Sequence, residues 1–483
     1  MEQKQVIAYQ RELFDINGQG VVYPFPGREA VSGAQGRKDL QVSTAGKQAR
    51  ALVCNLMEIV ISPNNIWTAY KQVKQNKGAG GIDGMQVEEF AVWFKAQGSH
   101  LIDELRSGKY QPQPVRSVEI PKPNGGVRRL GIPTVVDRVI QQAISQVLSP
   151  LYEAEFSPNS YGFRPNRSAH QALQKASEYV SLGRTVVVDI DLKNFFDAVN
   201  HDRLMYRLST KTGDKTLLKL IRKYLQSGIM IDGAVSQRTE GTPQGSPLSP
   251  LLSNTVLDEL DRELERRGHC FVRYADDCNI FVRSQKAGER VMQTLGGFIE
   301  NKLKLKINQE KSKVCVVSES KFLGYTILTN GMLTLSKQCI ERIKTKIRQI
   351  TRRNRGVKFE QIITELNQIL RGWLNYFRWA KCHKFVQNLD AWIRRKLRCY
   401  RIKQCKRVHT LQQFLHRQGV EKWQSWILAL SGKGLWRKSN CPQCNQAMGK
   451  EWFHKLGLYN LAFNYETFNN LQKPPCTKVC TVV

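Results

Sequence analysis

Three aspartates lie next to apolar stretches that are typical of buried strands. Asp276 and Asp277 belong to a Tyr-Ala-Asp-Asp sequence between two apolar segments, and Asp191 follows the β-branched run 186–190. Crowding carboxylates is costly unless a cation neutralises them, and oxygen ligands without His or Cys suit Mg²⁺. Two such ions can activate a 3′-hydroxyl and stabilise a leaving pyrophosphate. The pattern therefore predicts nucleotidyl transfer.

Each aspartate also has a plainer explanation. Asp is common in hairpin turns, and a Tyr-x-Asp-Asp match arises by chance in roughly a few per cent of chains of this length. For Asp189 and Asp197, which flank Asp191, capping or surface solvation is the favoured interpretation. For Asp191 that interpretation is much weaker, because Asp191 and Asp276 can lie on neighbouring strands of one sheet.

A Gly/Pro-rich loop at 240–251 leads into a predicted amphipathic helix at 248–267. Gly245 permits close backbone approach to a ligand, and the start of the helix favours anionic groups. Alone, this loop would be interpreted as a plain connector.

The elements that must position these residues can be outlined from periodicity and breakers. A hairpin is predicted at 115–132, and a helix follows at 134–148. Two short strands are predicted around a tight turn at Ala275 and Asp276, and further strands at 313–317 and 321–328. Beyond about residue 336 the strands end and helices with basic faces continue to about residue 430.

The charge narrows the choice of partners. The 483 residues carry a net charge of +33, and residues 331–450 hold 27 Lys and Arg against five Asp and Glu. A surface this basic predicts a nucleic-acid partner and argues against a strongly basic one. The 43 aromatic residues exclude a wholly disordered chain. No secretory signal and no apolar run of about 18 residues is present, so we expect no membrane partner and a reducing, cytoplasmic location.

Taken together and in this order, the motifs resemble the palm of a reverse transcriptase, specifically the proteins encoded by bacterial group II introns. The resemblance runs from about residue 50 to 460. It rests on the segments Gly81–Met85, Ile120–Gly126, Tyr161–Ser168, Pro243–Pro250, Tyr274–Asp277 and Phe322–Tyr325.

The resemblance implies roles for individual residues. Asp191, Asp276 and Asp277 would be the catalytic carboxylates that hold two Mg²⁺ ions. Asp191 is preferred to Asp189 because the family's aromatic sugar gate lies five residues after the first aspartate, and that position is Phe196. The residues implied to bind the incoming nucleotide and the nascent base pair are Lys122, Arg128, Phe196, Gln244 and Gly245. Asn194 departs from the family, which often has Gly there.

The basic helical region resembles the family's thumb, also called the maturase or X domain, through the Leu-Arg-Gly-Trp-Leu-Asn-Tyr-Phe sequence at 370–377. One predicted helix face is apolar and consists of Leu389, Trp392, Ile393 and Leu397, and basic residues fill much of the rest. A basic helix is usually just solvated, but the local charge favours an RNA-binding surface. The predicted RNA-binding residues are Arg164, Arg371, Arg394, Arg395, Lys396 and Arg398.

Four cysteines near the end of the sequence raise the question of a zinc site. Cys441, Cys444, Cys476 and Cys480 have paired spacing, and many relatives carry a C-terminal endonuclease with paired cysteines. The segments 435–440 and 452–458 instead resemble the short tail of members without that endonuclease, which is the interpretation we favour.

The expected fold is α/β: a right-hand polymerase with fingers and palm, followed by an all-α thumb. The expected divisions are a loose extension at 1–46, an N-terminal reverse transcriptase extension at 47–114, fingers and palm at 115–328, thumb at 336–430 and tail at 431–483.

The resemblance implies an RNA-directed DNA polymerase that uses dNTPs on an RNA template with a DNA primer. It also implies binding of a group II intron RNA, help in splicing, and retrohoming into target DNA as a bacterial cytoplasmic ribonucleoprotein. Two alternatives stay open: an intron-independent reverse transcriptase in repair or defence, and an RNA-binding splicing factor with a vestigial polymerase site.

Overall fold

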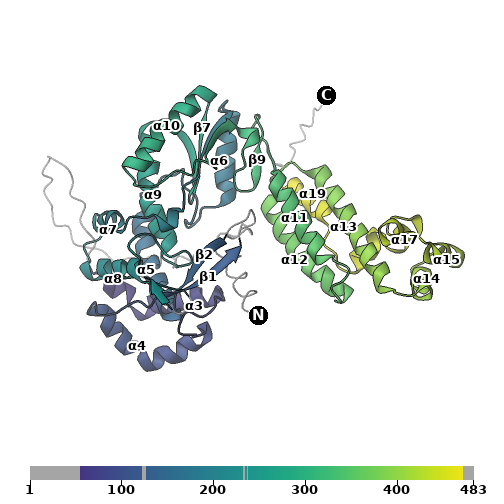
Figure 1. Cartoon of the computed structure of the whole chain (residues 1–483), viewed down its shortest axis with the longest axis horizontal. Coiled ribbons are helices and arrows are strands. Elements are labelled where there is room, and N and C mark those ends of the chain that lie inside the picture. Colours follow the sequence, from purple (N-terminus) through teal and green to yellow (C-terminus); the bar gives the residue numbers. More distant parts are fainter. Residues whose placement is uncertain (1–54, 122–126, 232–233, 237, 472–483) are drawn as a thin grey trace, which may run out of the picture. The chain divides into compact units, whose positions relative to one another are not determined.

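The computed structural model describes residues 55–121, 127–231, 234–236 and 238–471, so the predicted extension at 1–46 lies outside the described residues. The described residues form two compact units that divide between Val316 and Val317. The first unit mixes helices and strands. The second, called here the helical unit, consists of one short hairpin and helices (Figure 1). The predicted α/β region followed by a helical region is confirmed.

A four-stranded antiparallel sheet carries the predicted carboxylates. Its strand order is β6-β7-β3-β8, so β3 lies between β7 and β8. The strands are β3 (Val186–Ile190), β6 (Cys270–Tyr274), β7 (Asp277–Val282) and β8 (Lys313–Val316). The β-branched run of β3 suits this central position, because both of its faces are covered.

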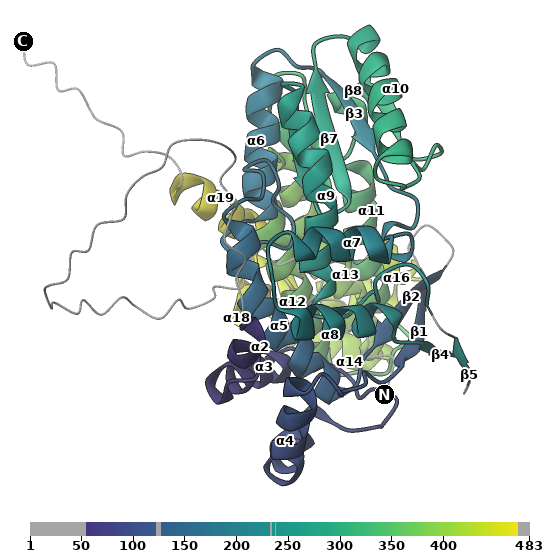
Figure 2. The same ribbon diagram turned by 90° about the vertical axis from the view of Figure 1, so that its left-hand side faces the viewer.

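Helices cover both faces of this sheet. On one face, Gly288 of α10 (Gln285–Asn301) lies so close to Val188 and Val314 that an added Cβ would be 2.4 Å from a Val314 methyl. On the other face, the ring of Tyr179 in α6 (Ala169–Ser181) lies 5.9 Å from that of Phe281. Figure 2 shows α6 and α10 on opposite sides of β3 and β7, and Figure 1 shows the same two helices on opposite sides of β7. The predicted helix at 248–267 is α9 (Ser249–Arg266), which packs against β6.

A second sheet has the order β2-β1-β4-β5. The predicted hairpin forms its β1 (Val115–Pro121) and β2 (Val127–Ile132), and β4 (Ile229–Ile231) and β5 (Ala234–Ser236) complete it. The predicted helix at 134–148 extends further, to Glu153. The helical segments of this part are α2 (Leu56–Val60), α3 (Pro63–Gln75), η1 (Val87–Glu89), α4 (Phe90–Arg106), α5 (Val135–Glu153), α7 (His201–Ser209) and α8 (Lys215–Gln226).

The helical unit starts with η3 (Val317–Glu319) and the hairpin of β9 (Tyr325–Ile327) and β10 (Leu333–Leu335). Trp373 and Leu374 are buried on α12. On the predicted apolar face of α13, Leu389, Ile393 and Leu397 are buried, whereas Trp392 is half-buried. The helices are α11 (Lys337–Ile350), α12 (Phe359–Phe377), α13 (His383–Gln404), α14 (Val408–Arg417), α15 (Lys422–Leu430), α16 (Leu435–Lys438), α17 (Pro442–Ala447), α18 (Lys450–Lys455) and α19 (Leu461–Leu471).

The strand predicted at 321–328 begins later than expected. Leu323 and Gly324 have φ values of 51° and 82°, so they form a left-handed turn that regular strand geometry excludes. Gly324 packs against the Phe377 ring, and the Tyr376 hydroxyl donates to the Leu323 carbonyl (2.9 Å). The β9–β10 hairpin thus belongs to the helical unit. The end of the palm at residue 328 stays a prediction.

Candidate active site

Asp191 lies immediately after β3 and is held by the segment that precedes β8. Its backbone N–H donates to Ser312 Oγ (3.0 Å), and its carboxylate accepts from Asn308 Nδ2 (3.0 Å). Lys311 Nζ lies 3.5 Å from the same carboxylate oxygen. These three partners are distant from Asp191 in the sequence. They meet it where β3 pairs with β8 and Leu192 forms a bridge with Ile307, which the local sequence pattern does not indicate.

Asp276 and Asp277 lie at the turn between β6 and β7. Residues 274–277 are called here the catalytic turn, after the role predicted for the two aspartates. Tyr274 and Asp277 form the last pair of the hairpin. Ile190 pairs with Cys278, so the register continued by one position places Asp191 opposite Asp277. The prediction that the two motifs meet on neighbouring strands is confirmed.

The surroundings of Asp276 favour a cation. Burial raises the pKa of Asp276, and the negative charge of Asp191 raises it further, whereas Arg128 and Arg273 act in the opposite direction. Two acidic groups that repel each other form a hard oxygen donor set of the kind that Mg²⁺ accepts. Within the described ranges, however, no three His, Cys, Asp or Glu side chains are grouped closely enough to ligate a metal.

Two basic residues were predicted to bind nucleotide from the β1–β2 hairpin. Arg128 lies on β2 and is half-buried, and its charge is felt by Asp276. The structure therefore brings it into electrostatic reach of the catalytic turn. Lys122 lies outside the described residues.

The Gly/Pro-rich loop at 240–251 is hydrogen-bonded both to the turn after β3 and to β2. Thr242 N–H donates to the Phe196 carbonyl (2.6 Å), and Gly131 N–H of β2 donates to the Gln244 carbonyl (2.8 Å). Gly241 has a φ of 87°, and an added Cβ would lie 2.8 Å from the Asp197 Cα. Gly245 also has a positive φ, of 110°. Backbone hydrogen bonds therefore bring the predicted residues Phe196, Gln244 and Gly245 into the same part of the fold.

Phe195 and Phe196 lie in the short helix η2 (Phe195–Asp197) and differ in burial. Phe195 is buried, whereas Phe196 is half-buried and meets the Phe195 ring edge-on at 5.4 Å. Asn194 precedes them with a φ of 48°, a left-handed conformation that Gly adopts freely and Asn tolerates. This conformation accounts physically for Asn at the position where the family resemblance leads us to expect Gly.

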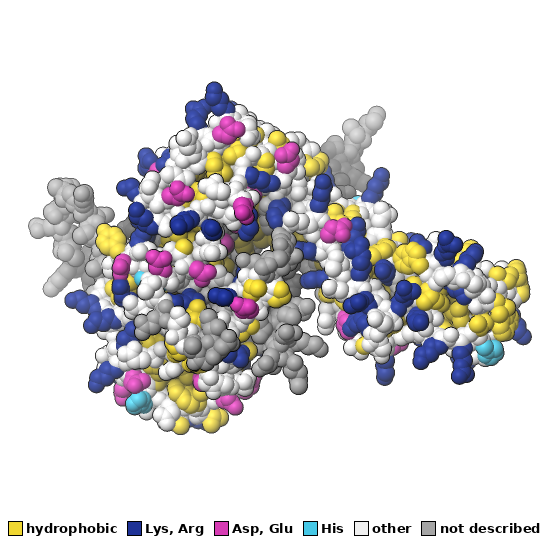
Figure 3. Space-filling model, viewed as in Figure 1, with side chains coloured by type: hydrophobic (Ala, Val, Ile, Leu, Met, Phe, Trp, Pro, Cys, Tyr) yellow, Lys and Arg dark blue, Asp and Glu magenta, His cyan; other side chains and the backbone are white. Residues whose placement is uncertain are grey.

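The predicted RNA-binding residues fall into two groups. Arg371 is exposed, and Arg394, Arg395 and Lys396 are half-buried on α13. The Arg395 guanidinium lies 3.9 Å from the centre of the Trp436 ring. Figure 3 shows many Lys and Arg side chains, and few Asp and Glu, on the viewed face of the helical unit.

Arg164 and Arg398 are corrected from RNA-binding to structural. The Arg164 side chain is 3% exposed, pairs with Glu153 (2.7 Å) and donates to the carbonyls of Ser157 and Ser160. Arg398 is buried and donates to Asn445 Oδ1 of α17. A guanidinium that is bonded inside the fold is not available to phosphate.

The cysteines of the described ranges form no disulfide. Cys441 caps the short helix α17, and Cys444 is buried, where burial raises the pKa of its thiol to about 12. Cys476 and Cys480 lie outside the described residues. No helix in the described part of the chain has the length and apolar character needed to cross a membrane.

Comparison with known families gives two matches. Residues 120–327 match the model of the reverse transcriptase (RNA-dependent DNA polymerase) family. Residues 340–419 match the model of the group II intron, maturase-specific domain.

Two individual relatives illustrate the similarity. Protein YkfC of Escherichia coli is 32% identical over 314 residues, which are 56% of this chain and 82% of that protein. The group II intron-encoded protein LtrA of Lactococcus lactis subsp. cremoris is 31% identical over 348 residues, and the match spans 58% of each chain. Among solved structures, a partial Cas6-RT-Cas1–Cas2 complex matches with 29% identity and a TM-score of 0.34, over 52% of this chain and 43% of that one.

Proposed function

This chain belongs to the reverse transcriptases that carry a group II intron maturase-specific domain, and we propose that it copies RNA into DNA and acts on a group II intron RNA. We further propose that it assists splicing of that RNA and supports retrohoming into target DNA, in a cytoplasmic ribonucleoprotein. The observation that carries the polymerase proposal is the meeting of Asp191 with the catalytic turn at one end of the sheet.

Asp191, Asp276 and Asp277 would hold the two Mg²⁺ ions together with phosphate oxygens of the substrate, because the described carboxylates do not by themselves form a closed metal site. When bound, such ions help to deprotonate the primer 3′-hydroxyl and stabilise the negative charge on pyrophosphate. Asn308 and Ser312 fix the position of Asp191 by hydrogen bonds to its side chain and backbone. Lys311 partly neutralises Asp191.

The other residues of the site would bind and select the nucleotide. Arg128 and Lys122 would bind the triphosphate, Arg128 as a forked donor and Lys122 as a point charge. Gln244 and Gly245 would line the nascent base pair, where the absence of a side chain at Gly245 permits close approach. Phe196 would lie under the sugar and exclude a 2′-hydroxyl.

RNA binding is proposed for the basic surface of the helical unit, through Arg371, Arg394, Arg395 and Lys396. Its support is the exposure of Arg371, the partial exposure of the α13 residues, and the match to the maturase-specific domain. Dense positive charge binds the RNA backbone and releases counterions.

The test of the polymerase proposal is primer extension on an RNA template by Asp276→Ala. We expect extension to be abolished while the circular dichroism spectrum and melting temperature stay near those of the wild type. The matched control is Asp202→Ala, which removes an exposed aspartate paired with Arg222 and should leave extension unchanged. Near-normal extension by folded Asp276→Ala would overturn the assignment.

The splicing role is tested separately with the same variant. Asp276→Ala should still bind and splice an intron RNA, because the proposed RNA surface lies on other residues. A group II intron RNA folds a hairpin called domain V, which is encoded just downstream of the protein. Such a sequence in the DNA after the gene would support the intron partner, and its absence would favour the intron-independent alternative.

A further inference from the structure

A fully buried ion pair lies behind the catalytic turn. Arg273 of β6 and Asp261 of α9 are each 0% exposed, and the guanidinium binds both carboxylate oxygens, at 2.7 Å and 2.5 Å. A buried pair must overcome a large desolvation penalty, and apolar replacements are often as stable. Stability alone therefore does not account for charges at this place.

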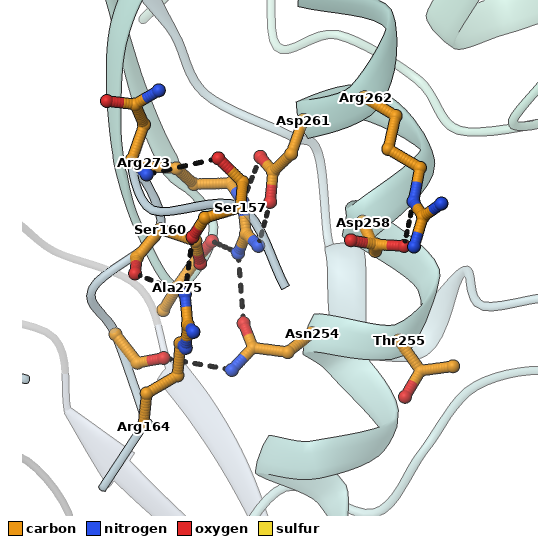
Figure 4. Close-up of polar contacts among 12 residues, drawn as sticks. Ser157, Ser160, Arg164, Asn254, Thr255, Asp258, Asp261, Arg262, Arg273 and Ala275 are labelled. Atoms are coloured by element: carbon orange, nitrogen blue, oxygen red, sulfur yellow. Dashed lines mark hydrogen bonds and ion pairs between the residues drawn. The ribbon is translucent and has the colours of Figure 1, made fainter. Parts of the chain in front are cut away.

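The same guanidinium contacts the catalytic turn directly. Arg273 Nη1 donates to the Ala275 carbonyl (2.9 Å) and to Asn254 Oδ1 (3.0 Å). Asn254 Nδ2 in turn donates to the Gly162 carbonyl (2.9 Å). Figure 4 shows these bonds converging between α9, the loop around Ser160 and the turn at Ala275. One network therefore connects the backbone of the turn to two other parts of the fold.

The turn has a backbone conformation that needs support. Ala275 has a φ of 57°, in the left-handed region that a residue with a Cβ disfavours. It is the residue immediately before Asp276, so a change in its conformation would redirect both aspartates. The bond from Arg273 to the Ala275 carbonyl opposes that change.

The backbone of Gly162 also packs against the catalytic turn. An added Cβ would lie 2.2 Å from the Ala275 nitrogen, so the Gly162 backbone packs directly on the turn. Tyr161 N–H donates to the Arg273 carbonyl (2.8 Å), and Arg273 N–H donates to the Asn159 carbonyl (2.9 Å). The loop thus binds β6 immediately before the turn begins.

We propose that Arg273, Asn254 and Gly162 are positioning residues for polymerisation, because they hold the catalytic turn in the conformation that directs Asp276 and Asp277. This inference rests on the proposed polymerase function. Asp261 fixes the guanidinium, Asn254 links it to the loop, and Gly162 provides the surface on which the turn rests. None of these residues needs to touch substrate.

The first test is Arg273→Lys, which keeps a positive charge for Asp261 but loses the planar set of donors that reaches Ala275 and Asn254 together. We expect kcat to fall by on the order of 100-fold, as for small misplacements of catalytic groups. The KM for primer–template should change little. Mn²⁺ binding to the primer–template complex, measured by electron paramagnetic resonance, should weaken as well.

The matched control is Arg138→Lys. Arg138 is also buried, but it donates to the Ala79 carbonyl in another part of the first unit. This variant should lose thermal stability without weaker Mn²⁺ binding. If Arg273→Lys behaves the same way, with native kcat and native Mn²⁺ binding in its folded fraction, Arg273 is a core residue only and the proposal is wrong.

A second substitution can distinguish a positioning role of Arg273 from a purely stabilising role. Ala275→Gly removes the penalty on the left-handed conformation, so adding it to Arg273→Lys should recover part of the lost kcat. No recovery would contradict the role given to that conformation.

Should Arg273→Lys not fold, Gly162→Ala retains the ion pair and places a methyl group against the turn. The same loss of kcat and Mn²⁺ affinity is then expected, and native values would overturn the proposal. A wild-type protein without primer extension would instead refute the polymerase function itself.

Discussion

Arginines serve opposite purposes in the two units of the molecule. Behind the catalytic turn, Arg273 is fully buried and bonded to Asp261, Asn254 and a backbone carbonyl. On α13, Arg395 is half-buried, stacks on Trp436 and donates to the Trp436 carbonyl (3.1 Å), with Lys396 nearby. The first arrangement fixes a backbone and leaves little freedom, whereas the second leaves the positive charge partly exposed to a polyanion.

This difference shows that the type of residue does not reveal its use. Arg398 is on the same helix as Arg395, only three residues later, yet it is buried against α17. We therefore expect substitutions in the first unit to have large effects on activity that depend on geometry. In the helical unit we expect substitutions to have small effects on RNA binding that depend on charge.

The largest effect is expected at Asp191. Asp191→Asn should reduce kcat by about 10³-fold or more, because loss of several kcal/mol of charge stabilisation has that consequence. Asp189→Asn is the matched control, since Asp189 lies within β3 opposite Asn279 and Lys313. Single-turnover primer extension measures both. A large loss at Asp189 with activity retained at Asp191 would reverse the assignment.

A smaller effect is expected at Phe196. Phe196→Val should raise the use of NTPs relative to dNTPs by on the order of 10- to 100-fold, measured as the ratio of kcat/KM for matched nucleotides. Phe195→Ala should not change this ratio, and should instead cost about 3–5 kcal/mol of stability because Phe195 is buried. An unchanged ratio in active Phe196→Val would refute the gate and weaken the choice of Asp191 over Asp189.

The smallest effect per residue is expected on α13. Replacing Arg394, Arg395 and Lys396 with Gln should lower the salt dependence of RNA binding, by about 0.7 to 0.9 in the log–log slope for each phosphate that is no longer neutralised. Arg398→Gln should lower the melting temperature and leave the slope unchanged. If the slope responds to Arg398 and not to the other three, the RNA surface has been placed on the wrong side of α13.

The backbone of the active site could be predicted because its signals are local. The β-branched run of β3 and the apolar segments around Tyr274–Asp277 specify strands and a turn without reference to distant residues. The partners of Asp191 could not be predicted, because Asn308 and Lys311 depend on the pairing of β8 with β3.

The predictions that the structure corrects concern residues whose tertiary contacts are not visible in the local sequence. Arg164 and Arg398 have the composition of surface residues, and only the fold shows that their guanidinium groups are bonded inside it. The left-handed turn at Leu323 and Gly324 was likewise missed, because the apolar segment around it favours a strand. In each case tertiary contacts outweighed the local pattern.

The central claim is that Asp191 and the catalytic turn form one divalent-cation site. The most direct test replaces Mg²⁺ with Fe²⁺ in the wild-type protein bound to primer–template, then adds ascorbate and peroxide, so that radicals cut the chain beside the metal. The account predicts fragments that end near residues 191 and 276, suppressed by excess Mg²⁺ and absent in Asp276→Ala. Cleavage that leaves both segments intact, or that Mg²⁺ does not suppress, would contradict it.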